Sequence, residues 1–423
     1  MTIRASYGMF NDRESVFSLN FIGQDQPFGN AITPTNPTLA NPWINQPGGN
    51  PFPITVNSNL PFQTNANVVT HPLNLEPTYL QQWNFSIQRQ LGTTWLVTAN
   101  YVGNHTTHLL TSTQDNYAVF LGTGPCSLNE VQAGKVVSVP QASCSTLANE
   151  TFRRVTYLQN PLQGQYYHGI AAVDDGGTAS YNALYLSATK RLSDGVSVLG
   201  NYTWSHCIGD IFDTQTGAAG ASVTDVPGDR NYYRSNCGTS DTRQLFNLSM
   251  VAIAPAFSNR ALRLIVTGWQ VSPIVRITSA QEFSVTSNVD TAVSGQAGQT
   301  PNYNGVNAYT SNRNACQSPP CVAWLASNSV SGAFSTPATG SYGNLGLNNF
   351  KGPGYFTLDV SLVRNFKIRE KISLQIRAEA FNLPNKANFS TPVATLTSGN
   401  FGQITSTGTN PPRIIQLAGK FYF

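Results

Sequence analysis

Three segments at the C-terminal end of the chain decide the fold: YFTLDVSLVRNF (residues 355–366), KISLQIRAEAF (371–381) and RIIQLAGKFYF (413–423). Each alternates apolar and polar residues, a period of two that is typical of a β-strand because successive side chains point to opposite faces. A soluble β-sandwich has the same period, but these segments of about ten residues or more exceed the usual ~5–6 residues of soluble strands. They therefore favour tilted strands that cross a membrane. The apolar side chains expected to point outward are Leu358, Val360, Leu374, Ile376, Leu417 and Phe421.

The composition suits one large β-barrel. Charged residues make up only 10% of the 423 residues, against a typical ~25%, and no break in composition divides the chain. No run of about 18 apolar residues occurs, which excludes a helical membrane protein. The net charge of +4 is too small and too dispersed to indicate a nucleic-acid partner. We expect a single all-β domain over residues 1–423, with no helix longer than about three turns.

Alternating segments recur along the whole chain. They include TIRASYGMF (2–10), QQWNFSIQRQL with TWLVTANYVG, RQLFNLSMVAIA with GWQVSPIVRITS, and a hairpin over Asp194-Gly195, a dipeptide that favours tight turns. Together they predict about ten antiparallel up-and-down strands. The long connections between them are expected at about 11–79, 104–179, 207–242, 286–353 and 384–411.

Long and short connections alternate along this series. Outer-membrane barrels have short periplasmic turns and long extracellular loops, so the alternation predicts a barrel in the cell outer membrane. Tryptophans also fall near the strand ends, Trp83 and Trp204 at the outer side and Trp95 and Trp269 at the inner side, as two aromatic girdles require. The first residues contain neither a basic region nor an apolar stretch of useful length, so we expect no signal peptide and interpret the sequence as part of a longer exported protein.

In these segments the chain resembles the C-terminal barrel of TonB-dependent outer-membrane receptors, in particular the Oar-like group with a carboxypeptidase-regulatory-like N-terminal domain. The resemblance covers nearly all residues and is carried by YNALYLSATKRLSDGVSVLGNYTWSH (181–206), GWQVSPIVRITSAQEFSV (268–285), the run from GNLGLNNFKG to LPNKANF (343–389) and the ending FYF. It implies a barrel of about 22 strands in the intact family, preceded by a plug domain that this sequence lacks. Pro273 departs from the pattern, because proline removes a ladder hydrogen bond where glycine would be more comfortable, and a local bulge is expected there.

The resemblance also implies a function and partners. The function is active uptake of a ligand across the outer membrane, with energy from the TonB complex, which would be contacted only through the missing plug. The ligand class, whether siderophore, glycan or peptide, stays open. The alternative is a passive porin-like barrel, or an adhesin or surface scaffold, in which the long loops carry the function.

The resemblance further implies that the C-terminal end is recognised by the barrel-assembly machinery. The residues expected to form this signal are Ile415, Leu417, Phe421 and Phe423. Since about ten strands carry the gentle curvature of a wide barrel, we expect a half-barrel with two open edges rather than a small closed ring.

The six cysteines fall two by two within the predicted loops. An exported chain meets an oxidising environment, so we expect three disulfides that restrict the loops, with free thiols or a metal site as alternatives. The segment CQSPPC has a spacing that a metal could use, but no histidine or second cysteine pair accompanies it in that loop. The expected pairs are Cys126 with Cys144, Cys207 with Cys237, and Cys316 with Cys321.

Other candidate sites have weaker support. His105 and His108 stand three residues apart, but a strand places such residues on opposite faces. Glycines near Gly122 lack the strand-to-helix context of a phosphate-binding loop. Four acids of the third loop lack the spacing of a calcium site and are interpreted as solvated: Asp210, Asp213, Asp225 and Asp229.

No catalytic triad or carboxylate pair stands out, so we predict neither an enzyme nor a bound cofactor or metal. Arg377, Glu379 and Lys420 lie on the polar side of the last strands and are interpreted as charges that face the barrel interior.

Overall fold

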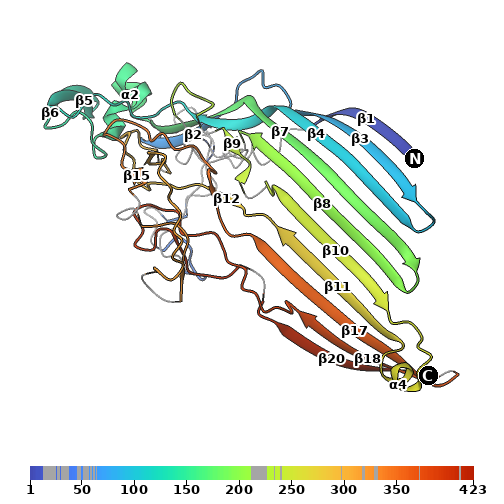
Figure 1. Ribbon diagram of the computed structural model, residues 1–423. Helices are drawn as coiled ribbons and strands as arrows, with labels where there is room; N and C mark the ends of the chain where they lie inside the picture. The colour runs from blue at the N-terminus through green and yellow to red at the C-terminus, as the bar shows by residue number, and fades with distance from the viewer. Residues whose placement is uncertain are drawn as a thin grey trace.

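The computed structural model describes the chain from Met1 to Phe423 except for residues 13–24, 26–28, 30–37, 45–48, 51–56, 58–59, 61, 63, 211–225, 233, 239–240, 297, 317–319, 328–331, 371 and 409–410. Its main element is an antiparallel sheet in which ten long strands follow one another (Figure 1). Across the sheet these are β1 (Thr2–Asn11), β3 (Tyr79–Leu91), β4 (Trp95–Gln114), β7 (Tyr167–Ser193), β8 (Val196–Gly209), β10 (Gln244–Ile253), β11 (Trp269–Thr278), β17 (Tyr355–Arg369), β18 (Ile372–Phe381) and β20 (Ile414–Tyr422).

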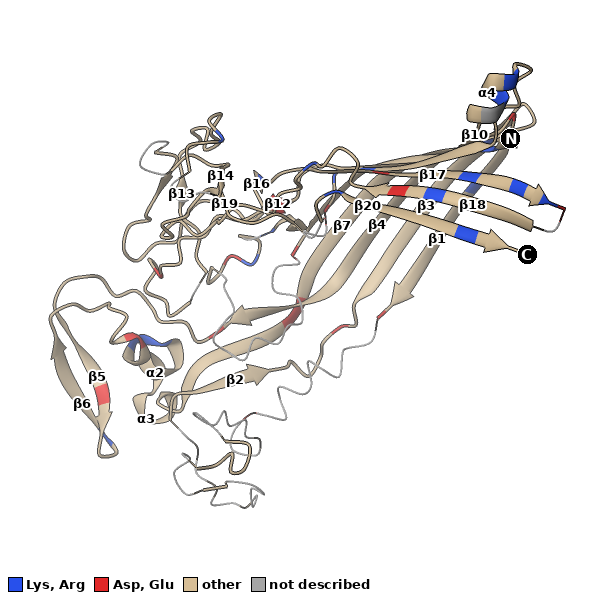
Figure 2. Ribbon diagram, turned by 90° about the horizontal axis from the view of Figure 1, so that it is seen from below, with Lys and Arg blue, Asp and Glu red and all other residues tan. Residues whose placement is uncertain are grey.

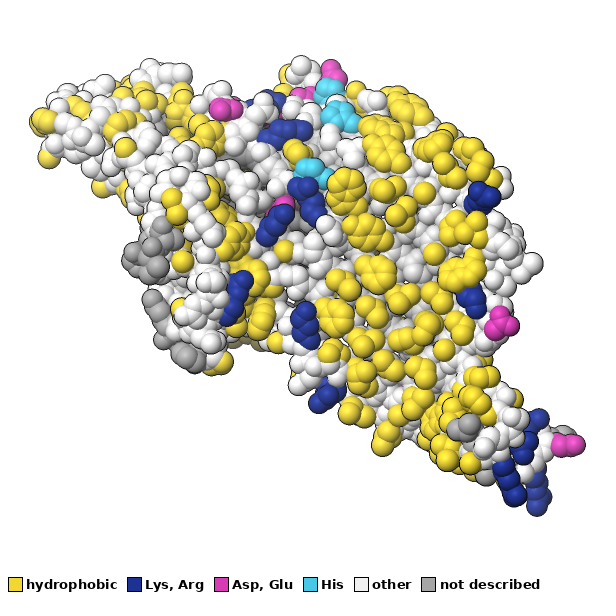
Figure 3. Space-filling model, viewed as in Figure 1, with side chains coloured by type: hydrophobic (Ala, Val, Ile, Leu, Met, Phe, Trp, Pro, Cys, Tyr) yellow, Lys and Arg dark blue, Asp and Glu magenta, His cyan; other side chains and the backbone are white. Residues whose placement is uncertain are grey.

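The sheet has one apolar and one polar face. Leu358 lies opposite Val275, and Leu374 lies opposite Phe421, so that apolar residues of neighbouring strands meet in rows. Leu417, on the same face, is 80% exposed. Figure 3 shows hydrophobic side chains over most of the visible sheet. Such an exposed apolar face is what a membrane-spanning sheet needs, and the predicted outward residues share it.

The tryptophans named in the sequence lie on this apolar face at its two ends. Trp83 and Trp204 are near the ends of β3 and β8 that lead into the long connections. Trp95 and Trp269 begin β4 and β11 at the opposite end, where the Arg364 guanidinium lies 5.6 Å from the Trp269 ring. Two tryptophans thus lie near each end of the apolar face, which is the arrangement that aromatic girdles have in membrane proteins.

Short turns join the strands at one end. Gly92, between β3 and β4, has φ +60°, and Asp194 and Gly195, between β7 and β8, have φ of 50° and 74°. Two successive positive φ angles are those of a type I′ hairpin turn, as the Asp-Gly dipeptide predicts. The turn between β10 and β11 contains the six-residue helix α4 (Arg260–Ile265).

The other helices of the described chain are shorter still, and none of its helices could span a membrane. The expectation of no helix beyond about three turns is therefore confirmed for the described residues.

Charged residues are sparse along the strands, and Lys and Arg gather near the turn end of β17 and on α4 (Figure 2). A Lys or Arg on the lipid face of a barrel costs about 2–4 kcal/mol at the membrane midplane and little near the interface, which explains this distribution.

The second connection is shorter than the predicted 104–179, because β4 continues to Gln114 and β7 begins at Tyr167. The sequence pattern indicates a loop there because Asp174 to Gly177 contains residues typical of turns. The ladder between β4 and β7 nevertheless continues, with Thr111 opposite Asp174. Its register shifts near His108, whose φ is 53°.

Pro273 stays in register, opposite Val360 of β17. The bulge expected at this position does not form. Instead, the ladder between β10 and β11 lacks its pairs between Ser249 and Ala252. Proline lacks the N–H group that this ladder would need, so the strand gives up pairs on one side without changing register.

The long connections fold into a body of their own. We call the described parts of residues 115–166, 226–243, 279–354 and 382–413 the loop cap. Its elements are the β5–β6 hairpin (Cys126–Gln132, Lys135–Gln141), η1 (Glu150–Arg153), α2 (Val155–Gln159), α3 (Pro161–Gly164), β9 (Ser235–Asn236), which pairs with β8, and three two-residue ladders, β12–β16 (Glu282–Phe283, Phe350–Lys351), β13–β15 (Asn302–Tyr303, Phe334–Ser335) and β14–β19 (Val322–Ala323, Gln403–Ile404). In the first connection, β2 (Ala66–Thr70) pairs in parallel with β7.

The loop cap has a hydrophobic core centred on Phe350, which is 4% exposed. The Phe350 ring centroid lies 5.4 Å from that of Phe334, 5.5 Å from Tyr303, 6.0 Å from Tyr309 and 6.1 Å from Phe283. These rings come from segments up to 67 residues apart in the sequence, so their packing holds the fourth connection together.

Arg153 joins the second connection to the fourth. Its side chain is fully buried, and its Nη2 donates to the carbonyl oxygens of Thr146 at 2.9 Å and Val293 at 3.0 Å. Its Nε donates to Asn149 Oδ1 at 3.0 Å. A buried guanidinium that satisfies several carbonyls fixes the segments that supply them.

The sheet is open. In the described chain β1 pairs with β3 alone and β20 with β18 alone, and the two strands form opposite edges of the sheet in Figure 1. The expected half-barrel with two free edges is therefore what the structure contains.

Candidate functional site

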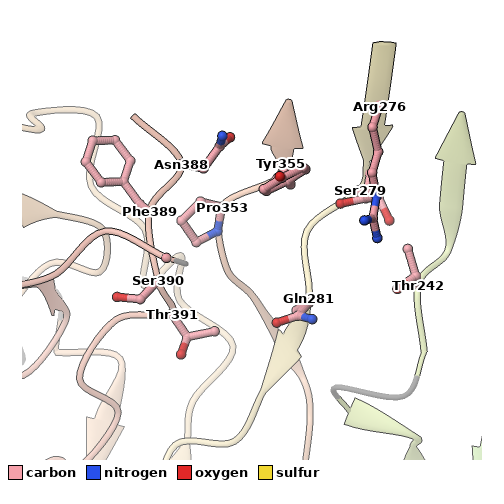
Figure 4. Close-up of a pocket in the computed structure, with 13 residues that line it drawn as sticks. Thr242, Arg276, Ser279, Gln281, Pro353, Tyr355, Asn388, Phe389, Ser390 and Thr391 are labelled. Carbon is pink, nitrogen blue, oxygen red and sulfur yellow. The ribbon is translucent and has the colours of Figure 1, made fainter. Parts of the chain in front are cut away.

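A polar pocket lies where the polar face of the sheet meets the loop cap. It has a volume of about 470 Å³, within the usual range of small-molecule sites. The ends of β11 and β17 supply one part of its wall and the fifth connection supplies another (Figure 4). Its lining includes Thr242, Arg276, Ser279, Gln281, Pro353, Tyr355, Asn388, Phe389, Ser390 and Thr391.

Arg276 supplies the positive charge of this pocket. In the sheet register it lies opposite Thr357 and Asn247, which places it on the polar face. Figure 4 shows its side chain extending from the end of β11 toward Ser279. Its guanidinium carbon lies 5.6 Å from the centre of the Tyr355 ring, and within the described chain it forms no ion pair. No acidic residue lines the pocket, so the charge is uncompensated.

Local hydrogen bonds hold the pocket walls. Asn388 is 3% exposed and binds β17 twice, because its Oδ1 accepts from Phe356 N at 2.8 Å and its Nδ2 donates to Phe356 O at 2.9 Å. On the other wall, Ser279 Oγ accepts from Gln244 N at 3.1 Å. Ser390 Oγ donates to Ser406 O at 2.9 Å. The polar groups of these three residues are therefore used in building the pocket.

The neighbouring Arg243 differs from Arg276 in its surroundings. Its Nε lies 2.9 Å from Asp241 Oδ2, and its Nη2 lies 3.7 Å from Glu282 Oε1. Asp241 also lies 3.2 Å from Nδ1 of His206. Burial raises the pKa of the Glu282 carboxyl above its ordinary value, and the charge of Arg243 opposes that shift. Arg243 thus pairs with two buried acids and belongs to a structural network.

The structure brings the six cysteines together in the three expected pairs, and Cα atoms of each pair lie 5.4, 5.4 and 6.0 Å apart. Cys126–Cys144 lies at the base of the β5–β6 hairpin, and Cys207–Cys237 links the end of β8 to the third connection. Oxidation of these thiols in the exported protein stays a prediction.

The expected charged residues of the last strands lie on the polar face. Arg377 Nη1 is 3.4 Å from Glu379 Oε1, and Lys420 lies opposite Gln375. Ile415, Leu417 and Phe421 lie on the apolar face, and Phe423, the last residue, is 98% exposed. That the charged residues face the barrel interior remains a prediction. That the C-terminal apolar residues direct assembly also remains a prediction.

The structure does not bring the other candidates together. His105 Nδ1 lies 2.8 Å from Ser180 Oγ, whereas His108 Nε2 lies 3.1 Å from Glu76. Asp210 pairs with Arg234 at 2.7 Å. Asp213 and Asp225 lie outside the described residues. Among the described side chains no group of three or more potential ligands could hold a metal.

Sequence reasoning did not find the pocket. Its residues come from the third, fourth and fifth connections and from the ends of β11 and β17, and they share no spacing motif. One signal was present, because Arg276 is the charged residue of the segment GWQVSPIVRITS and stands on its polar side.

Comparisons with known proteins agree with the architecture. The profile of the family described as outer membrane beta barrel domain matches residues 1–416. No curated protein sequence matches the chain.

Among solved structures, the chain is similar to the outer membrane transporter YddB from Escherichia coli (TM-score 0.40, 10% identity, covering 85% of this chain and 34% of that chain). It is also similar to the ferripyoverdine receptor of the outer membrane of Pseudomonas aeruginosa (0.37, 13%, 82% and 27%) and to the ferric-catecholate import receptor Fiu from E. coli (0.38, 9%, 100% and 33%). The chain spans about a third or less of the length of these proteins. On the family match, the chain belongs to the outer membrane beta barrel domain family and is located in the cell outer membrane.

Proposed function

We propose that this chain is the C-terminal part of the barrel of a TonB-dependent receptor of the Oar-like group, which takes up a ligand across the outer membrane. One observation carries the proposal. The sheet has an apolar and a polar face, and at the loop-side end of the polar face lies a polar pocket in which the charge of Arg276 has no paired acid among the described residues. A ligand arriving from the loop side would meet this pocket before it reached the polar face. Coupling to the TonB complex would run through a plug domain encoded upstream.

A surface scaffold or adhesin is the second candidate. It is favoured by the loop cap, because a loop body with its own aromatic core, such as that around Phe350, can present a fixed binding surface without any transport. A passive pore receives no such support from a particular residue.

The experiment compares cells that make the natural protein with cells from which its gene is deleted and with cells whose TonB is inactivated. Compounds that disappear from the medium are measured by mass spectrometry. Uptake predicts that one compound is depleted only when both the gene and TonB are intact. Depletion that survives TonB inactivation would favour a passive pore, and the absence of any gene-dependent depletion would favour the scaffold.

A further inference from the structure

The polar side chains of the Arg276 pocket fall into two groups. Asn388, Ser279 and Ser390 are engaged in hydrogen bonds that build the walls. Thr242, Gln281 and Thr391 line the pocket, yet within the described chain their side chains form no hydrogen bond, and Arg276 forms no ion pair. The hydroxyl of Thr278, which also lines the pocket, likewise forms no hydrogen bond among the described residues, so the pocket presents a cation, an amide and three hydroxyl groups that the fold itself does not use.

The contrast with Arg243 makes the uncompensated charge informative. Both arginines stand near the loop-side ends of neighbouring strands, β10 and β11, and the two segments are hydrogen-bonded through Gln244 and Ser279. Arg243 has the carboxylates of Asp241 and Glu282 beside it. Arg276 has an aromatic ring beneath it and an opening in front of it. A guanidinium in this setting matches an oxyanion, because its planar N–H groups bind carboxylate or phosphate in pairs.

We propose that this pocket binds a small polyhydroxylated oxyanion, in which Arg276 receives the carboxylate or phosphate. Thr242, Gln281 and Thr391 exchange hydrogen bonds with the ligand hydroxyls. This inference rests on the proposed receptor function, since it names the ligand class of the same site. Recognition by a single exposed cation also makes binding sensitive to ionic strength.

The test measures binding rather than uptake, so that its failure and that of the proposed function can be told apart. Outer-membrane vesicles from cells making the natural protein are titrated with galacturonate, galactose 6-phosphate and galactose, with empty vesicles subtracted. These probes share a sugar ring and differ in the oxyanion. We expect galacturonate or galactose 6-phosphate to bind with an affinity at least about tenfold higher than that of galactose. Salt at 0.5 M, where the Debye length is roughly 4 Å, should weaken this binding. Whichever of the two anions binds more tightly identifies the oxyanion as carboxylate or phosphate.

Three variants sharpen the test. Arg276→Gln removes the charge and Gln281→Glu adds an opposing one, and each should lower anion affinity by about tenfold. Arg4→Gln is the control, because Arg4 is an exposed arginine on the polar face of β1, at the edge of the sheet. It should leave binding unchanged. Heat-dependent gel mobility reports that each variant is folded.

Equal affinity for galactose and both anions, unchanged anion binding by folded Arg276→Gln and Gln281→Glu, or no binding of any probe would overturn the proposal. Tight anion binding without uptake would uphold the site and reject the transport function. Gene- and TonB-dependent uptake of an uncharged compound would uphold the transport function and reject the oxyanion site.

Discussion

Leu417 in the sheet and Phe350 in the loop cap are both large apolar residues, but Leu417 is 80% exposed and Phe350 only 4%. The sheet keeps its apolar side chains on the surface because lipid is their solvent, and its order comes from continuous backbone ladders. The loop cap stands in water and buries its apolar rings, together with charged groups such as Arg153. The chain thus contains two regions that are stabilised differently, a sheet held by backbone ladders and a loop cap held by a buried core. The two regions should respond to different perturbations.

The largest difference should appear on deleting Tyr422 and Phe423. The last strand should then lose its recognition by the barrel-assembly machinery, so that most outer-membrane insertion is lost while synthesis continues. Insertion is measured by membrane fractionation and heat-dependent gel mobility. Lys420→Gln, a change on the polar face of the same strand, is the control. Equal insertion of the shortened chain would refute the sorting role.

Phe350→Ala should damage the loop cap and spare the sheet. Removing a buried aromatic ring costs about 3–5 kcal/mol through lost burial and the cavity that remains. Hydrogen exchange should therefore rise around the β12–β16 and β13–β15 ladders, with unchanged protection in β17 and β18. Leu73→Ala is the matched control, because Leu73 is fully exposed. Simultaneous loss of protection in the sheet would show that the sheet and the loop cap unfold as one cooperative unit.

The disulfides should stabilise the loop cap according to the length of chain that they close. Replacing Cys207 and Cys237 by Ser opens a separation of 30 residues, and replacing Cys316 and Cys321 opens one of 5. The chain-entropy relation gives about 3–4 kcal/mol for the former and about 2 kcal/mol for the latter. Proteolysis of the cap with and without reductant measures the order of the two effects. Non-reducing mass mapping that finds six alkylatable thiols would contradict the premise.

The smallest effect concerns pH and Glu150. Its Oε1 lies 3.2 Å from His168 Nε2 and 3.0 Å from Arg154 Nη2. The contact with His168, and then the charge of Arg154, hold the pKa of Glu150 below its ordinary value although burial opposes this. A lowered carboxyl pKa stabilises the folded state above the ordinary pKa of Glu, and this stabilisation is lost as pH falls through the lowered value.

Glu150→Gln should therefore lower the stability of the loop cap at neutral pH. The stability of this variant should also fall less steeply than that of the original protein as the pH is lowered. Protease resistance of the cap between pH 7 and about pH 3 gives the measurement, and Glu130→Gln in the β5–β6 hairpin is the control. An unchanged slope in acid would mean that Glu150 does not govern this transition.

The sheet could be predicted from the sequence because each strand carries its own evidence. The alternation of Leu374 and Ile376 with polar residues, and the Asp194-Gly195 turn, are local patterns that the lipid environment imposes. The predicted strands and their order follow from them, whereas the open edges are expected from the resemblance, which implies the gentle curvature of a wider barrel.

The loop cap could not be predicted in this way. Its ladders are two residues long, and Phe350 meets rings from distant segments, so no periodicity marks it. Among the described residues Arg276 forms no ion pair, whereas the nearby Asp241 and Glu282 lie beside Arg243. Such pairing depends on tertiary contacts that residue spacing does not contain.

The length of β7 has a mechanical consequence. Its 27 residues extend over roughly 90 Å at about 3.3 Å per residue, whereas a tilted strand needs only about 9–11 residues to cross the hydrocarbon region. More than half of the strand therefore exceeds the length needed to cross the membrane, and its first residues pair with β4 on one side and with β2 on the other. This part of β7 carries the β5–β6 hairpin, which lies beyond its first residues (Figure 1), so that the hairpin is held at a distance from the segment of the sheet that crosses the membrane.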